Sequence, residues 1–208
     1  MTASLAQLRS RRAFLTKAIV AGATAMGACT ATRPLRAATG LLLPTHYADA
    51  ATAAAFWAKP RVLNLYRPST GEHQRLCYWQ DGGLDRSGYL GICRLLRDAK
   101  AERAVTIDLR LLNLLRGMTG WLETVYGLSE PYQINSGYRT VTTNAMTEGA
   151  ARNSFHIRGM AVDGRMPGLP EAYLGRLFAA FQGGGVGFYL NQQHFIHTDV
   201  GRVRFWIR

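Results

Sequence analysis

The chain is short of acidic residues: 13 Asp and Glu stand against 25 Lys and Arg among 208 residues, a net charge of +12. No acidic residue lies in the first 38 positions, which hold six basic ones, so the remainder has a net charge of +6. A basic patch with interleaved aromatic residues is also missing, which argues against a nucleic-acid-binding protein. A basic surface on an exported protein suits an anionic cell wall or membrane surface instead.

A long apolar run is absent as well, because the stretch from Ala18 to Ala28 is too short to anchor a protein in a bilayer. The preceding Ser10–Lys17 reads Ser-Arg-Arg-Ala-Phe-Leu-Thr-Lys, which is typical of a twin-arginine signal. We therefore predict that residues 1–38 are an export segment and that the protein is periplasmic. Cleavage could occur before Cys29, leaving it lipidated as a membrane anchor, or near Ala37, and the sequence leaves both open.

Cysteine is rare, and only Cys77 and Cys93 remain beyond the export segment. An oxidising compartment permits a disulfide between them, and two unpaired core thiols are the alternative. Apolar residues make up 48% of the chain, enough for one core and one domain. We predict a linker or short helix over residues 39–60 and a catalytic domain over residues 61–208.

Hydrophobic periodicity predicts an α+β fold, with helices packed on a mainly antiparallel sheet. Two strands separated by a turn at 68–72 form a hairpin, and residues 140–152 form a loop with a helical turn. Leucine spacing predicts helices at 89–97, 108–126 and 169–181. The predicted strands are 61–67, 73–79, 132–136, 160–163, 186–189, 195–200 and 203–206.

Two pairs of polar residues could together bind a divalent metal ion. His156 and Asp163 are seven positions apart, which on a regular strand places them on opposite faces, but Gly159 permits a bend that brings both to one point. His197 and Asp199 are two positions apart and share one face of a strand. Three protein ligands plus a water are the arrangement of a catalytic zinc site.

The order and spacing of these residues resemble a known family. Ser136-Gly137-Tyr138-Arg139, then Ser154-x-His156-x-x-Gly159-x-Ala161-x-Asp163, then His197-x-Asp199 resembles the M15 metallopeptidases, which are zinc D-Ala-D-Ala peptidases and their relatives. The chain is particularly similar to the exported, YcbK-like (DUF882-type) murein endopeptidase branch, over about residues 61–206. The Gly183–Tyr189 run and the Val203–Trp206 ending are part of this similarity. The resemblance implies the D-Ala-D-Ala peptidase or hedgehog-like zinc peptidase fold.

The resemblance also implies roles for individual residues. Zinc would be bound by His156, Asp163 and His197, and would polarise the scissile carbonyl and lower the pKa of the attacking water. Arg139 would face the carbonyl oxygen as it becomes an oxyanion. Ser154 would contact substrate or orient His156. Tyr138 is the other candidate for substrate binding. The alternative is that its side chain only packs within the fold.

The general base is the one departure from the family pattern. Better-known M15 enzymes carry a Glu three residues before the last histidine ligand, and His194 occupies that position here. A histidine can accept a proton near neutral pH, so His194 is a candidate base. Asp199 is a second candidate and could instead fix a histidine tautomer. Glu148 is the third.

The sequence therefore predicts a zinc-dependent murein endopeptidase that hydrolyses peptide cross-links of peptidoglycan. Cross-links that contain diaminopimelate are the favoured substrate. Within this class the branch resemblance ranks a D,D-carboxypeptidase second. The alternative is a catalytically inactive peptidoglycan-binding or scaffold protein with the same fold. A structural zinc protein would need a fourth protein ligand, for which Cys77 or Cys93 is the evident donor, and a disulfide between them would exclude it.

Overall fold

The structure is a computed structural model that describes residues 41, 43–44, 50–190 and 194–208. The predicted export segment, Cys29 and the first part of the predicted linker lie outside these residues. Within the described part of the chain, no helix has the length and apolar character needed to cross a membrane.

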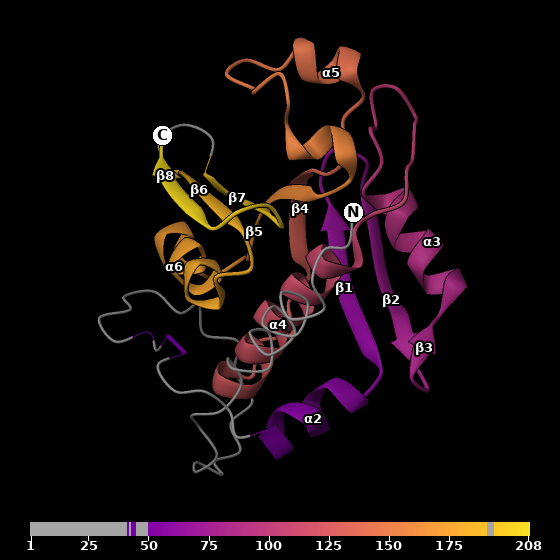
Figure 1. The fold of residues 1–208 in the computed structure, drawn as a ribbon, viewed down its shortest axis with the longest axis vertical. Coiled ribbons are helices and arrows are strands. Elements are labelled where there is room, and N and C mark those ends of the chain that lie inside the picture. The colour runs from indigo at the N-terminus through magenta and orange to yellow at the C-terminus, as the bar shows by residue number, and fades with distance from the viewer. Residues whose placement is uncertain (1–40, 42, 45–49, 191–193) are drawn as a thin grey trace, which may run out of the picture.

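One sheet of eight strands runs through the domain in the order β3-β2-β1-β4-β5-β7-β6-β8 (Figure 1). The β1–β4 and β6–β8 pairs are parallel and all others are antiparallel, which confirms the predicted α+β fold with a mainly antiparallel sheet. The strands are β1 (Arg61–Arg67), β2 (Glu72–Gln80), β3 (Gly83–Leu84), β4 (Tyr132–Ser136), β5 (Ala161–Arg165), β6 (Gly185–Tyr189), β7 (Phe195–Asp199) and β8 (Arg204–Ile207).

Three of the helices pack on the sheet and share one apolar core with it: α3 on β2, α4 on β1, and α6 on β6 and β7. The longest, α4, begins after Asp108, whose carboxylate accepts a hydrogen bond from the Arg110 N–H, and ends at Gly127 with a φ of 65°. The helices are α2 (Ala50–Ala58), α3 (Arg86–Leu95), α4 (Leu109–Tyr126), α5 (Val141–Ala145) and α6 (Glu171–Phe181), with a 3₁₀ turn η1 (Phe155–Arg158).

Helix α2 lies within the predicted linker and packs on the domain. The Arg61 guanidinium lies between the rings of Trp57 and Trp79, 4.9 and 4.7 Å from their centroids. The Arg116 guanidinium of α4 lies 4.6 Å from the Phe56 ring centroid. Cation–π contacts of this kind join α2 to β1, β2 and α4.

Two helical glycines give opposite expectations for substitution by alanine. A Cβ at Gly88 in α3 would collide with the backbone carbonyl of Cys77 in β2, whereas a Cβ at Gly117 in α4 would meet no atom within 4 Å. Gly88→Ala is therefore expected to lower the free energy of unfolding by about 1–3 kcal/mol. Gly117→Ala, the matched control, is expected to raise it by about 0.5–1 kcal/mol. Thermal unfolding of both variants measures this, and an unchanged melting temperature for Gly88→Ala would contradict the described packing of α3 on β2.

Candidate metal centre

Three different elements carry the predicted ligands: His156 lies on η1, Asp163 on β5 and His197 on β7. Asp163 and His197 are directly opposite each other in the antiparallel β5–β7 pair, which lies side by side in the sheet (Figure 1). The expectation that His156 and Asp163 share a bent strand is wrong, because His156 precedes β5 in a 3₁₀ turn. The Ser154 hydroxyl begins this turn by accepting a hydrogen bond from the His156 N–H at 3.3 Å, and Gly159 ends it with a φ of 63°.

The three side chains are buried, and their ligand atoms lie within 4.8 Å of one another. Asp163 Oδ1 is 3.1 Å from His156 Nε2 and 2.8 Å from His197 Nδ1, and the two nitrogens are 3.2 Å apart. This is the one group of His, Cys, Asp and Glu residues in the described ranges whose atoms converge in this way. These residues could hold a metal ion.

The hydrogen bonds on the far side of each ring assign the tautomers. His156 Nδ1 is 2.6 Å from the Gly137 carbonyl, which can only accept, so Nδ1 carries the proton and Nε2 has a free lone pair. His197 Nε2 is 3.0 Å from Asp199 Oδ2, which leaves Nδ1 to face the cluster. The two inner nitrogens and a carboxylate oxygen thus face one another, an arrangement that a cation, either a proton on His197 or a metal ion, stabilises.

Burial and charge set the protonation of the cluster. Burial lowers the pKa of His156, which favours its neutral form. Burial alone would raise the pKa of Asp163, but the contacts of its carboxylate with His156 and His197 bring it well below its ordinary value. Burial alone would lower the pKa of His197, but hydrogen bonds to Asp163 and Asp199 raise it to about 8. A metal ion would therefore compete with a proton for His197 near neutral pH.

Arg139 contacts the cluster directly. Its Nη2 donates to Asp163 Oδ2 at 2.6 Å and its Nε donates to Ser136 Oγ at 2.9 Å, with the arginine side chain 11% exposed. The next residue, Thr140, is held by Asp98, whose Oδ2 accepts a hydrogen bond from the Thr140 N–H at 2.8 Å. The sequence did not single out Asp98, because nothing in the chain places it beside a residue 42 positions later.

Asp199 lies behind His197, and its side chain has no exposed surface. Besides His197 Nε2, its oxygens accept from the backbone N–H groups of Gly185 and Gly201 at 3.1 and 2.8 Å and from the Arg204 guanidinium. A carboxylate with this many donors is held in one orientation. It fixes the ring of His197.

The other predicted residues lie outside the cluster. Tyr138 is half-buried and packs against the apolar core. His194 and Glu148 are exposed, and neither makes a hydrogen bond or ion pair with the three ligands within the described part of the chain. His194 immediately precedes β7 and has a φ of 47°.

Cys77 and Cys93 are both free thiols, so the structure has unpaired cysteines rather than a disulfide. Neither belongs to the converging group of His156, Asp163 and His197. The described residues thus offer three protein ligands and no cysteine as a fourth.

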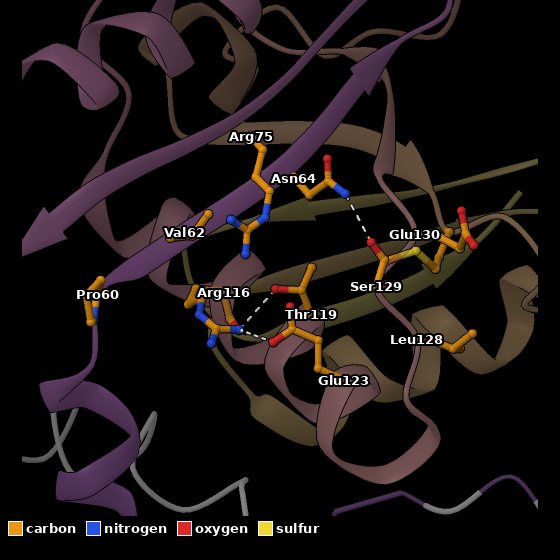
Figure 2. A pocket seen from close by; sticks show the side chains of 11 residues that line it. Pro60, Val62, Asn64, Arg75, Arg116, Thr119, Glu123, Leu128, Ser129 and Glu130 are labelled. Atoms are coloured by element: carbon orange, nitrogen blue, oxygen red, sulfur yellow. Dashed lines mark hydrogen bonds and ion pairs between the residues drawn. The ribbon is translucent and has the colours of Figure 1, made fainter. Parts of the chain in front are cut away.

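A polar pocket of about 110 Å³ lies elsewhere, between the beginning of β1, helix α4 and the segment before β4 (Figure 2). Figure 2 shows Arg75 and Arg116 extending toward it, with Glu123 and Glu130 also on its lining. Arg116 and Glu123 pair with each other at 3.1 Å. No residue of the metal cluster lines this pocket.

Known proteins resemble this chain over most of the described residues. A family model described as peptidoglycan L,D-endopeptidase MepK matches residues 55–206. Peptidoglycan L,D-endopeptidase MepK of Escherichia coli (strain K12) is 30% identical over 152 residues, 71% of this chain and 81% of that protein. The protein named probable peptidoglycan L,D-endopeptidase MepK of Haemophilus influenzae is 31% identical over 153 residues, 71% of this chain and 80% of its own. The chain belongs to the M15 peptidase family, in the group that this model describes.

Proposed function

We propose that this chain is a zinc-dependent murein endopeptidase that is exported to the periplasm by the twin-arginine route and hydrolyses peptide cross-links of peptidoglycan. The observation that carries the proposal is the convergence of two imidazole nitrogens and one carboxylate oxygen, backed by Arg139, in a chain of this family. The names of the relatives indicate an L,D bond as the target. The net charge of +6 outside the predicted export segment favours association with the anionic wall polymer.

The ligand geometry fits zinc. Zn–N and Zn–O bonds of about 2.0–2.1 Å in a tetrahedron place neighbouring ligand atoms about 3.3 Å apart. The three separations here are 2.8, 3.1 and 3.2 Å. His156 Nε2, His197 Nδ1 and Asp163 Oδ1 would hold the ion, and the fourth position would be open to water or substrate. Bound there, zinc supplies Lewis-acid activation of a carbonyl and of water.

The chain's own residues provide charge and proton transfer. Arg139 has one guanidinium nitrogen, Nη1, without a hydrogen bond in the described residues, and we assign it to the carbonyl oxygen that gains negative charge. The exposed His194 is the proposed general base. Asp199 is fully buried behind His197, so we assign it the role of fixing that ligand rather than accepting the proton.

These two assignments predict different effects for substitutions at His194 and Asp199, which are five positions apart. His194→Ala is expected to lower kcat by about 10²-fold and to leave zinc affinity unchanged, because the residue takes part in proton transfer only. Asp199→Asn is expected to weaken zinc binding by about 10- to 100-fold. Competition with a chromophoric chelator measures zinc affinity, and release of soluble peptides measures kcat. Full turnover by His194→Ala would rule out its role as base.

The bond specificity is tested by digesting purified peptidoglycan with the protein, with and without a zinc chelator, and identifying the fragments by mass spectrometry. We expect cross-linked peptide dimers to disappear, and to persist when the chelator is present until zinc is restored. Unchanged fragments from a protein with bound zinc would favour the inactive, peptidoglycan-binding alternative, in which His194 marks a lost base.

A further inference from the structure

We propose that Arg204 is a positioning residue for both histidine ligands. It fixes the position of His197 through Asp199 and that of His156 through Phe155. This inference rests on the proposed zinc site at His156, Asp163 and His197. It concerns β8, the edge strand beside β6, in which Arg204 is the first residue (Figure 1).

The contact of Arg204 with Asp199 is bidentate. Nη2 donates to Oδ2 at 2.7 Å and Nη1 donates to Oδ1 at 3.1 Å. Paired N–H···O bonds of this kind fix geometry as well as charge. Asp199 Oδ2 is the same atom that accepts from His197 Nε2 at 3.0 Å, so Arg204 reaches His197 through a single carboxylate.

The charge of Arg204 is needed because Asp199 is fully buried. A buried carboxylate without a paired cation is costly. The ion pair with Arg204 offsets this cost and holds the Asp199 carboxylate in the orientation that contacts His197 Nε2. This contact leaves His197 Nδ1 directed at the cluster.

The Arg204 guanidinium lies over two aromatic rings. Its Cζ lies 5.4 Å from the centroid of Phe155, the residue before His156, and 4.9 Å from that of Trp206. The Trp206 ring lies 5.3 Å from the imidazole of His197. Arg204 thus contacts both Phe155, in the turn that carries His156, and Trp206, whose ring packs against His197.

Three glycines make room for this assembly. A Cβ at Gly185 would collide with Arg204 and Asp199, a Cβ at Gly187 with the Trp206 ring, and a Cβ at Gly201 with the Phe155 ring. The glycine-rich run therefore packs closely against the C-terminal Val-Arg-Phe-Trp segment, and together they support the two histidine ligands.

The test compares Arg204→Ala and Arg204→Lys with Arg202→Ala, which removes the same charge from an exposed residue two positions earlier that does not contact Asp199 in the described structure. Competition with a chromophoric chelator is expected to show zinc affinity about 10- to 100-fold weaker in Arg204→Ala and unchanged in Arg202→Ala. Arg204→Lys keeps the charge and loses the bidentate geometry, so its affinity is expected to fall between the two. In the zinc-loaded proteins, the slowly exchanging His197 Nε2–H signal is expected in nuclear magnetic resonance spectra of wild type and to be lost in Arg204→Ala.

A merely structural Arg204 would lower the melting temperature and leave zinc affinity and the imidazole signal unchanged at temperatures well below unfolding, which would overturn the proposal. If Arg204→Ala does not fold, an unchanged zinc affinity in Arg204→Lys overturns it equally. Wild-type protein that binds no zinc would refute the metal site itself and with it this role, an outcome distinct from zinc binding that survives loss of Arg204.

Discussion

His156→Ala is expected to bind less than stoichiometric zinc and to release no peptide fragments from peptidoglycan. The substitution removes one of the three converging ligand atoms and leaves Asp163 Oδ1 and His197 Nδ1, 2.8 Å apart, as the remaining donors. Two ligands do not complete the protein's share of a catalytic zinc site. Elemental analysis of zinc per chain and a peptidoglycan digest measure the two effects.

The matched control is His73→Ala. His73 is an exposed histidine on β2 whose Nε2 lies 2.7 Å from Asn64 Oδ1, and it is not part of the converging group. Its loss is expected to leave zinc content and digestion at wild-type levels. A His156→Ala protein that keeps one zinc per chain and full activity would show that the reaction does not use this cluster.

Arg139→Ala is expected to lower kcat by about 10²- to 10³-fold while zinc stays bound. All three ligand side chains remain, but the scissile carbonyl loses the positive charge proposed to stabilise its oxyanion. Asp163 also loses its ion-pair partner at 2.6 Å, so a loss of stability accompanies the loss of rate. Single-turnover digestion of a soluble cross-linked peptide, with zinc content measured on the same sample, separates rate from metal occupancy.

Arg165→Ala is the control for charge, since Arg165 ends the same strand as Asp163 and its Nε donates to Gln133 Oε1 at the surface. This variant is expected to digest at the wild-type rate. If Arg139→Ala also keeps wild-type kcat, the guanidinium does not contact the reacting carbonyl.

The local periodicity of hydrophobic residues predicted most of the fold. The alternation at 61–67 and the leucine spacing at 108–126 predicted β1 and α4 to within a residue, because each pattern reflects burial of one face against a single core. The placement of His156 could not be obtained in the same way. The sequence predicted a bend at Gly159 between His156 and Asp163, but not the 3₁₀ turn that the Ser154 cap begins and the left-handed Gly159 ends.

The sequence predicted which three side chains converge, but it did not predict the residues that support them. The spacing of His197 and Asp199 already placed both on one face of a strand, and their side chains are 3.0 Å apart. The partners behind them are the Gly137 carbonyl and the Arg204 guanidinium, which belong to separate segments. Contacts between distant segments depend on the sheet order, in which β8 returns beside β6, and no local pattern encodes that order.

The most direct test of the account is a crystal structure of the zinc-loaded protein with anomalous diffraction measured at the zinc absorption edge. We expect one strong peak bonded to His156 Nε2, His197 Nδ1 and a carboxylate oxygen of Asp163, at about 2.0–2.2 Å from each. An active, zinc-loaded protein whose peak lies elsewhere, or whose peak is closed by a fourth protein ligand, would contradict the proposed catalytic centre.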